Sequence, residues 1–459
     1  MKKTTRTISG VTPVAVMTQP MRCPGRCIYC PTFVVTPQSY TPESPAVLRG
    51  KECDFDARGQ VDLRLRALSE MGHPTDKVEL IIMGGTFLAT PEEYQYCFIK
   101  ECYDALNGGE SATLEEAKRV NETAAHRCTG LCIETRPDWC GQEEIDRMLE
   151  FGTTRVELGV QMLDDDIYRL VRRGHTVADV VKASALLREH GFKVHYHWMP
   201  GLPGSTPEKD LELSRLLFSD DSFKPDGLKL YPTVVVEGTE LERWYQEGRY
   251  QPYDSDTMID LMAEIKSIVP KYVRISRVLR DIPSKFIVAG CKDSLREAVR
   301  QLMEQRSVEC KCIRCHEYGH RLRRGWEAGE PRLVRMDYPA SGGWEVFLSF
   351  EDERETLFGV LRMRVKSQPV ARLGPVKEGD FALIRELHVY GPELSLSQQN
   401  PTAAQHKGLG KALLKEAERI ARDEFQAKQM LVLSGVGARE YYRAEFGYVL
   451  QGDYIARTL

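Results

Sequence analysis

The feature that most constrains this fold is a repeated alternation of short apolar segments with longer amphipathic ones between residues 14 and 278. The apolar segments predict strands at residues 14–17, 78–83, 130–133, 155–160, 193–199, 227–231 and 273–278. Segments of helical period lie between them, at 61–71, 91–106, 114–126, 142–151, 177–190, 208–218 and 257–269. A chain that repeats strand and helix in this way forms a parallel sheet, so we predict a full or partial barrel of βα units.

Chemically active residues fall where these strands should end. The loops that would follow the strands carry a cysteine motif, Gly84-Gly85-Thr86, residues 134–138, Gln161 and residues 200–204. Because the active sites of such barrels lie on the loops that follow the strands, we expect these loops to meet at one site. His195 and His197 alternate along a strand and should face the same side. That pair is compatible with a metal site, although satisfied core histidines are more common.

The cysteine motif consists of Cys23, Cys27 and Cys30, spaced C-x3-C-x2-C, with Tyr29 before the last cysteine. Three thiolates can hold three corners of a 4Fe-4S cluster and leave the fourth iron open to a small chelating molecule. The alternatives are a zinc site and unrelated buried thiols. Zinc usually takes four ligands from paired C-x2-C units, and no partner pair lies nearby in the sequence, which favours iron and sulfur.

The motif and its position after the first predicted strand resemble the signature of radical S-adenosylmethionine (radical SAM) enzymes. The resemblance implies that SAM chelates the open iron and that one electron from the cluster cleaves SAM to a 5′-deoxyadenosyl radical. It also implies that Gly84, Gly85 and Thr86 form the glycine motif that receives the amino group of SAM. By themselves, glycines after a strand predict only a turn or a close approach of the backbone to a ligand.

Length and composition give these motifs their context. The chain has 459 residues, enough for two or three domains, and its 42% apolar and 28% charged residues are typical of a soluble globular protein. Thirteen cysteines, an odd number partly gathered in clusters, suit metals better than disulfides and predict a reducing, cytoplasmic location. We expect no membrane role, because we find neither a signal peptide nor an apolar span of about 18 residues. A net charge of −4 means that an RNA site must be a local basic patch.

A second cysteine cluster follows the predicted barrel. Cys310, Cys312 and Cys315 lie close together in the sequence, and this crowding of soft ligands predicts a small structural zinc site. The fourth ligand is open among Cys291, His316 and His320, and we favour Cys291. Incidental thiols on a basic loop are the alternative.

The same stretch is rich in arginine and contains aromatic residues. The residues are Arg314, Tyr318, Arg321, Arg323, Arg324, Trp326, Arg332 and Arg335. Clustered arginines with aromatics suit phosphate contact and base stacking in RNA. A solvated charged face is an equally good interpretation.

The pattern becomes antiparallel after about residue 331. Residues 343–350 and 357–366 alternate across an acidic turn, as a hairpin would, and residues 382–390 predict a further strand. The run from Gln405 to Gly410 has the form Q-x-x-G-x-G, with its first glycine at Gly408, and precedes a strongly amphipathic helix at 411–425. A glycine-rich loop at a helix N-terminus presents free backbone N–H groups to phosphates.

These elements, followed by a strand at 430–436 and by Tyr441 and Tyr442, resemble the GNAT acetyltransferase fold. The resemblance implies that the loop binds the pyrophosphate of acetyl-CoA and that a tyrosine protonates the departing thiolate. The tyrosine pair lies one residue farther from Gly447 than in that fold, and of the two we favour Tyr442.

A radical SAM region followed by a GNAT region resembles one family, the catalytic subunit of Elongator and its single-chain archaeal and bacterial relatives. The resemblance extends over nearly the whole chain, through residues 76–79, 83–87, 133–138, 158–161, 173–176, 229–233, 280–283, 342–345 and 385–391. It implies an enzyme that uses acetyl-CoA to install a carboxymethyl-type group at C5 of the wobble uridine of tRNA, with thioester hydrolysis releasing CoA. The implied partners are the anticodon loop of tRNA and a reductant for the cluster.

The resemblance also assigns contacts to acetyl-CoA. The implied contact residues are Lys77, Glu386, Leu387, His388, Val389, Leu409, Gly410 and Lys411. Uridine 34 must leave the anticodon stack to reach such a site. We predict three regions: a radical SAM domain at 1–290, a cysteine-rich zinc and basic linker at 291–330, and a GNAT-type acetyl-CoA domain at 331–459.

The sequence leaves two other functions open. A protein lysine acetyltransferase of the histone type, with a merely structural cysteine cluster, would use Tyr442 and a carboxylate base such as Glu386 and would need no SAM. A tRNA-binding scaffold with decayed catalysis is the second, although intact ligands at Cys23 and Gly408 argue against it. The sequence does not fix the oligomeric state and leaves a homo-oligomer open.

Overall fold

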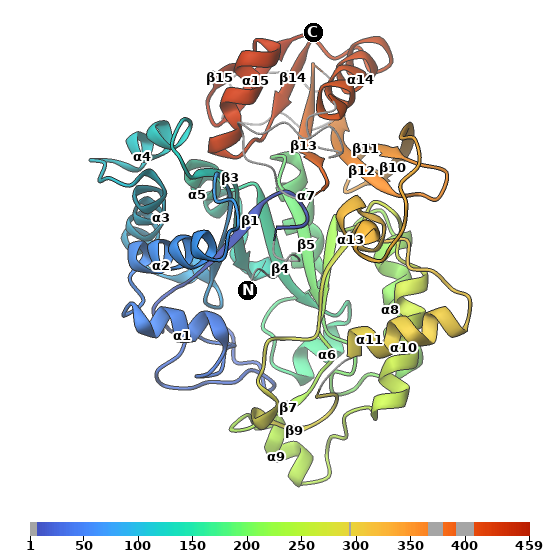
Figure 1. Cartoon of the computed structure of the whole chain (residues 1–459). Helices are drawn as coiled ribbons and strands as arrows, with labels where there is room; N and C mark the ends of the chain where they lie inside the picture. Colours follow the sequence, from blue (N-terminus) through green and yellow to red (C-terminus); the bar gives the residue numbers. More distant parts are fainter. Residues whose placement is uncertain (1–6, 293–294, 366–379, 392–407) are drawn as a thin grey trace.

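The computed structural model describes residues 7–292, 295–365, 380–391 and 408–459. Within these residues the chain forms two seven-stranded sheets and a pair of short strands. Figure 1 shows the second sheet, at the top, beside one end of the first. No helix in the described ranges combines the length and the apolar character needed to cross a bilayer.

The first sheet contains parallel strands that lie in space in the order in which they follow one another in the chain. They are β1 (Thr12–Met17), β2 (Lys77–Met83), β3 (Arg127–Thr135), β4 (Arg155–Gln161), β5 (Lys193–Trp198), β6 (Gly227–Leu230) and β8 (Arg274–Val278). Every neighbouring pair is parallel. Because β1 and β8 each pair on one side only within the described sheet, the barrel is open, which confirms the prediction of a partial barrel.

Helices connect these strands. They are α1 (Pro45–Glu52), α2 (Ala57–Glu70), α3 (Glu92–Asn107), α4 (Leu114–Asn121), α5 (Gln142–Phe151), α6 (Asp165–Leu170), α7 (Val177–Glu189), α8 (Pro207–Ser219), α9 (Glu240–Gln246) and α10 (Ser255–Ser267). Several begin at caps that the sequence supplies: Thr113, Thr176 and Thr206 each accept a hydrogen bond from the backbone N–H three residues on.

Alternation along each strand decides which side chains face the barrel interior, because successive residues of a strand point to opposite faces. On β2, Val78 and Ile82 are fully buried in the apolar core, whereas Glu79 lines a central cavity. On β5, His195 and His197 both line that cavity, as their spacing predicted. Polar residues at alternate positions of otherwise apolar strands therefore build the site.

A helical linker follows the barrel. It contains α11 (Leu295–Gln305), α12 (Ile313–His316) and α13 (Tyr318–Arg323), while β7 (Val235–Val236) and β9 (Ile287–Ala289) form the small sheet. The backbone N–H of Ile313 donates a 2.9 Å hydrogen bond to the carbonyl of Val273, which holds α12 against the start of β8.

The second sheet is mixed. Its strands, in spatial order, are β10 (Arg332–Ala340), β11 (Gly343–Glu351), β12 (Leu357–Val365), β13 (Phe381–Val389), β14 (Gln429–Val432), β16 (Tyr454–Thr458) and β15 (Val449–Gln451), with α14 (Leu409–Asp423) and α15 (Arg439–Phe446). Only the β13–β14 pair is parallel among the described pairs of this sheet. The predicted hairpin is confirmed as β11 and β12. The sequence did not predict β10, because this largely exposed edge strand carries Arg332, Arg335 and Asp337.

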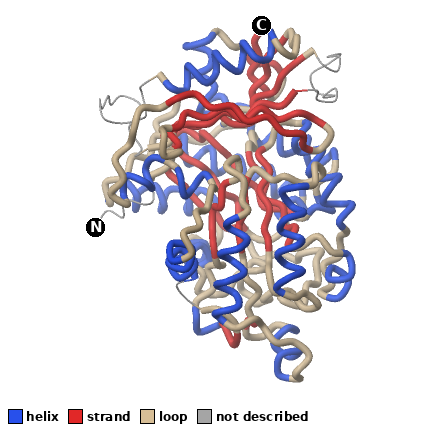
Figure 2. Tube along the Cα trace, turned by 90° about the vertical axis from the view of Figure 1, so that its right-hand side faces the viewer, coloured by secondary structure: helices blue, strands red, loops and turns tan. Residues whose placement is uncertain are grey.

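A buried network of charges joins the two sheets, which Figure 2 shows crossing one above the other. Its members are Arg188 and Glu189 of α7, Asp226 before β6, Glu345 of β11, Arg362 and Arg364 of β12, and Arg385 of β13. Arg385 donates to both carboxylate oxygens of Asp226, at 2.7 and 2.8 Å. Burial alone would raise the pKa of Asp226, but the charges of Arg385 and Arg188 outweigh it and hold that pKa well below its usual range.

Candidate active site

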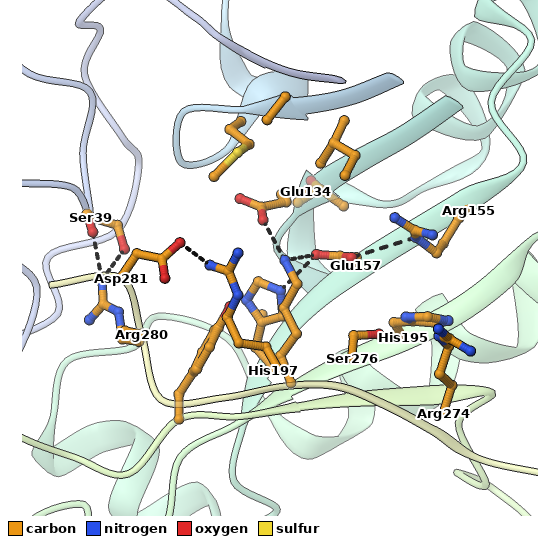
Figure 3. Close-up of a pocket in the computed structure, with 18 of the residues that line it drawn as sticks. Ser39, Glu134, Arg155, Glu157, His195, His197, Arg274, Ser276, Arg280 and Asp281 are labelled. Atoms are coloured by element: carbon orange, nitrogen blue, oxygen red, sulfur yellow. Dashed lines mark hydrogen bonds and ion pairs between the residues drawn. The ribbon is translucent and has the colours of Figure 1, made fainter. Parts of the chain in front are cut away.

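A cavity of about 480 Å³ runs through the half-barrel. Its lining includes Cys23, Cys27 and Cys30, which follow the last residue of β1, and Glu386 of β13. Glu386 pairs with Lys193, the first residue of β5, at 3.3 Å. The cavity therefore extends from the carboxyl ends of the barrel strands to their amino ends, where the second sheet begins, and Figure 3 shows part of its polar wall.

The three cysteines of the first motif all line the cavity. Their three sulfurs do not all lie within 4.8 Å of one another. A single zinc ion would draw its thiolates to within about 4 Å, because each Zn–S bond is about 2.3 Å long. The wider spacing fits a 4Fe-4S cluster better than zinc.

Hydrogen-bond donors surround these sulfurs. Arg173 Nη1 lies 3.5 Å from the sulfur of Cys27, and Gln38 Nε2 lies 3.3 Å from that of Cys30. Burial, followed by the charge of Cys27, raises the pKa of Cys30 to about 11. The loop therefore holds a protonated thiol at neutral pH unless a metal displaces the proton, and the nearby donors then stabilise the thiolates.

The glycine motif adjoins the cysteine loop. Gly85 and Thr86 line the cavity, and the Thr86 hydroxyl lies 3.5 Å from the sulfur of Cys23. Gly84 has φ of +143°, and a Cβ at this position would overlap the side chain of Thr18. The sequence thus supplies glycine where the backbone must pass close to Thr18, just after β1. The role of this motif in SAM binding stays a prediction.

Polar side chains meet within the cavity, and Figure 3 shows Glu134, Glu157 and His197 close together there. Ligand atoms of Glu134, Glu157 and His197 lie within 4.8 Å of one another, a spacing that would suit a metal. The ammonium group of Lys229 instead bonds both carboxylates, at 2.9 Å from Glu134. Burial lowers the pKa of Lys229, but the two carboxylates outweigh it and hold that pKa well above its usual range. A permanent side-chain cation therefore takes the place that a metal would need.

His195 and His197 lie in different environments. His197 lies 3.1 Å from a carboxylate oxygen of Glu157 and packs edge-on against Tyr231. His195 is buried, its ring lies against Gly227, and its Nδ1 has no hydrogen-bond partner among the described residues. The two rings contribute to the polar wall, and only His197 belongs to a group with metal-like spacing.

At the other end of the cavity lie two of the four β13 residues that are expected to contact acetyl-CoA. Glu386 and His388 line the cavity, whereas Leu387 packs against the core of the second sheet and Val389 lies beside Gly410. The His388 Nε2 lies 2.6 Å from the carbonyl of Ser9, so the N-terminal segment closes this end.

Glu386 itself is held as a carboxylate. It accepts a 2.7 Å hydrogen bond from Arg362 Nε and pairs with Lys193. Burial alone would raise the pKa of Glu386, but the charges of Lys193 and Arg362 outweigh it and hold that pKa far below its usual range. A carboxylate so strongly stabilised is a weak proton acceptor, which disfavours Glu386 as a general base.

The glycine-rich loop is described from its second half. Gln405 lies outside the described residues, whereas Gly408, with φ of +79°, is the N-cap of α14. A Cβ on Gly410 would lie 3.2 Å from the hydroxyl of Tyr441, so that tyrosine reaches the loop. Tyr442, which we favoured, is 5% exposed and packs in the apolar core of the second sheet. Both remain candidates, and Tyr441 is the one beside the loop.

Lys77 and Lys411 are the two lysines predicted to contact acetyl-CoA. Lys77 begins β2 and shares a face with Glu79, whose environment includes His388. It therefore lies at the end of the barrel nearest β13. Lys411, in the first turn of α14, forms an ion pair with Glu445 of α15.

The second cysteine cluster is compact. The sulfurs of Cys310, Cys312 and Cys315 lie within 4.8 Å of one another. Hydrogen bonds from the thiols of Cys310 and Cys312 lower the pKa of Cys315 far below its usual range. This spacing is the one that zinc requires.

Cys291, the fourth zinc ligand that we favoured, does not belong to this compact group of sulfurs. The sulfur of Cys291 lies 3.9 Å from the hydroxyl of Ser255 at the start of α10. The positive charge of Lys266, near the end of α10, instead contributes to the lowered pKa of Cys315. Eleven residues of helix separate the two places by about 16 Å. Cys291 follows the short strand β9 and lies beside Ser255, a position that spacing in the sequence could not reveal.

The ring nitrogens of the two histidines contact other groups than the three sulfurs. His316 contacts two backbone carbonyls, Nδ1 with Glu355 at 2.9 Å and Nε2 with Cys310 at 3.1 Å. His320 Nε2 lies 3.0 Å from Glu317. Among the described histidines, cysteines and acidic residues, none joins the three thiols as a fourth ligand.

The arginines of the linker do not form one surface. Arg321 is buried and pairs with Glu309 at 2.8 Å, Arg335 pairs with Asp337 and Glu424, and Arg314 lines the cavity. Arg323, Arg324 and Arg332 are exposed. The stretch thus supplies a smaller basic surface than its sequence suggested.

The predicted site residues lay mainly in loops, and charged residues inside the strands were not predicted. Those that line the cavity include Glu79, Arg155, Glu157, Lys229 and Arg274. The available signal was a charge at alternate positions of a strand that is otherwise apolar, which places the charge on the interior face of an open barrel. Arg136 and Arg173, beside the cysteine loop, were also missed as individual site residues.

Comparison with known proteins adds family information. Residues 20–217 match the Radical SAM superfamily and residues 225–305 match the Radical_SAM C-terminal domain. The chain is 66% identical over 459 residues to tRNA uridine(34) acetyltransferase of Dehalococcoides mccartyi, with both proteins fully covered. It is 42% identical over 475 residues to Elongator complex protein 3 of Bos taurus, covering 100% of this chain and 86% of that one.

One solved structure is similar over the same extent. It is the archaeal Methanocaldococcus infernus Elp3 with an N-terminal deletion, which superposes with a TM-score of 0.88 at 46% identity. The match covers 98% of this chain and 100% of that one.

Proposed function

This chain belongs to the radical SAM family that contains tRNA uridine(34) acetyltransferase and Elongator complex protein 3, and from that membership we propose that it modifies C5 of the wobble uridine of tRNA with the acetyl group of acetyl-CoA. The observation that carries the proposal is the continuous cavity, which joins the cysteine loop to β13. A carbon radical in water is short-lived, so its generator, the acetyl donor and the base must meet in one enclosed space.

The cysteine loop supplies one end of this reaction. Cys23, Cys27 and Cys30 would hold a 4Fe-4S cluster, and Arg173 and Gln38 would donate hydrogen bonds to its thiolates. When bound there with SAM, the cluster supplies the electron that generates a 5′-deoxyadenosyl radical able to abstract hydrogen from the acetyl methyl group.

The second sheet supplies the acetyl donor, and we assign it to the GNAT type. A parallel pair, β13 and β14, with α14 between them in the chain, supports this assignment. The backbone N–H groups at the start of α14, from Leu409 to Lys411, would bind the pyrophosphate of acetyl-CoA. Glu386 and His388 line the cavity beside β13, where the acetyl group would enter. Tyr441, beside Gly410, is placed to protonate the departing thiolate.

The polar wall would receive the base. Glu134 and Glu157 share the ammonium group of Lys229 between the two ends. Uridine 34 must be turned out of the anticodon stack to enter, as chemistry on a base requires. We place the radical SAM domain at residues 1–290, the linker at 291–330 and the acetyl-CoA domain at 331–459.

A tRNA-dependence assay tests this function. Anaerobically prepared protein with SAM should hydrolyse acetyl-CoA at least about tenfold faster with a tRNA that carries U34, a difference of about 1.4 kcal/mol in barrier height. The matched control is the same tRNA with cytidine at position 34, which should neither gain a C5 group nor accelerate the release of CoA. Lysine peptides should give no stimulation.

Faster turnover with lysine peptides and none with tRNA would instead favour a protein lysine acetyltransferase. The relatives described above bear the names of tRNA-modifying and Elongator proteins, so that alternative has no support from them. The absence of both responses, with no SAM cleavage, would favour the scaffold.

The linker thiols provide a separate prediction. We propose that Cys310, Cys312 and Cys315 bind structural zinc, with a fourth ligand that is not Cys291. Cys312→Ala should remove the zinc and leave the iron content unchanged, as measured by mass spectrometry of metals in purified protein. Cys291→Ala is the matched control and should retain zinc. Loss of zinc in the control, or its retention in Cys312→Ala, would contradict this assignment.

A further inference from the structure

A buried arginine lies against the cysteine loop and is not fully paired. Arg136 follows β3, is 4% exposed and lines the cavity. Its Nε and Nη2 donate to the two carboxylate oxygens of Asp138, at 2.9 and 2.7 Å. The third nitrogen of the guanidinium group, Nη1, is buried and has no hydrogen-bond partner among the described residues. A buried donor without an acceptor costs about 1–3 kcal/mol, so its retention calls for an explanation.

Two glycines make room for this guanidinium group. A Cβ on Gly25, between Cys23 and Cys27, would overlap Arg136 Nη1 and would lie 3.6 Å from the sulfur of Cys23. A Cβ on Gly174 would lie 3.1 Å from Arg136 Nη2. Gly25 does not adopt a positive φ, so its backbone conformation does not require glycine. What requires glycine there is the closeness of the arginine.

Asp138 fixes the direction in which the unpaired donor, Nη1 of Arg136, points. Because the carboxylate holds Nε and Nη2 on one side of the planar guanidinium, Nη1 must point away from Asp138 and toward the cysteine loop. The side chain cannot turn to find another acceptor without breaking both bonds. A fixed donor aimed at a loop of metal ligands indicates that its acceptor arrives with the metal.

We propose that Arg136 is a positioning and tuning residue for the cluster: its Nη1 donates a hydrogen bond to a sulfur of the bound cluster and raises the reduction potential. This inference rests on the cluster of the proposed function. Reduction adds one negative charge, and a buried cation with an N–H···S bond stabilises the reduced state more than the oxidised one. The proposal adds Arg136 to the contact that Arg173 already makes with Cys27.

The inference is tested by a redox titration followed by electron paramagnetic resonance, on anaerobic full-length protein without SAM. At a fixed solution potential, Arg136→Met should lower the ratio of reduced to oxidised cluster about tenfold, which corresponds to about 59 mV for one electron. Arg136→Lys keeps the charge and should give a smaller shift. Gly25→Ala keeps Arg136 but displaces its guanidinium, and should shift the potential in the same direction as Arg136→Met.

The matched control is Arg26→Met, which removes the same charge from the same loop at an exposed position and should shift the potential little because water screens it. Iron and sulfide content must equal that of the unchanged protein for a shift to count. Potentials in Arg136→Met and Gly25→Ala that equal the potential of the unchanged protein, with full clusters, would overturn the proposal, as would weaker SAM binding without a change in potential. Loss of the cluster in all three variants would also overturn it, in favour of a purely structural role.

The proposed function and the role of Arg136 can be refuted separately. If the unchanged protein binds no reducible iron–sulfur cluster, the cluster itself is refuted. If the cluster is present and reducible but indifferent to Arg136, only the present inference is refuted.

Discussion

Cys27→Ala should reduce the C5 modification of wobble uridine to background while the chain stays folded. Cys27 is half-buried in a loop and belongs to no helix or strand, so its loss should cost only about 1 kcal/mol of stability. The chemical effect is far larger, because two remaining thiolates cannot hold the proposed cluster with one open iron. The result would be read by mass spectrometry of nucleosides from the tRNA of cells that carry the variant.

Two further measurements make this prediction specific. Cleavage of SAM to 5′-deoxyadenosine by the purified variant should also fall to background, and thermal unfolding should stay close to that of the unchanged protein. Cys97→Ala removes an exposed thiol outside the cavity lining and should leave modification unchanged. Persistent modification in Cys27→Ala would exclude the cysteine loop from the reaction.

The barrel could be predicted from the sequence because its determinants are local. Alternating apolar residues fix which face of β2 is buried, and threonine caps such as Thr176 fix where helices begin. The cysteine motif needed only the rule that loops after parallel strands form the site. Each of these patterns spans fewer than about 15 residues and survives without knowledge of the rest of the chain.

The remaining features depend on contacts between distant parts of the chain. Arg136 and Gly25 are far apart in sequence and touch only because β1 and β3 lie in one curved sheet. The pair formed by Lys193 and Glu386 requires the second sheet to meet the barrel. Cys291 illustrates the reverse case, because a cysteine near a cluster in sequence is carried away by its own backbone path. No periodicity encodes such contacts.

Arg385→Met should lower the free energy of unfolding more than any other substitution described here. Arg385 is fully buried and bridges Asp226 of the barrel to Glu345 of the second sheet, with a further 2.9 Å hydrogen bond to the carbonyl of Phe192. Removing one member of a buried ion pair leaves an uncompensated charge and typically costs about 3–5 kcal/mol. Arg335→Met is the matched control, because Arg335 pairs with Asp337 and Glu424 at the surface and such pairs contribute about 1 kcal/mol or less.

The pH dependence of this loss follows from the sign of the pKa shifts. Burial raises the pKa values of Asp226 and Glu345, but neighbouring arginines, Arg385 first among them, outweigh it and lower both below their usual range. Carboxyl groups with lowered folded-state pKa values stabilise the fold above their unfolded-state pKa values, about 4, and lose that contribution as the pH falls through the folded-state values. The difference in unfolding free energy between the unchanged protein and Arg385→Met should therefore be greatest near pH 7 and narrow below about pH 4. Urea unfolding at several pH values measures it, and a difference that does not change with pH would show that Arg385 acts through packing and not through charge.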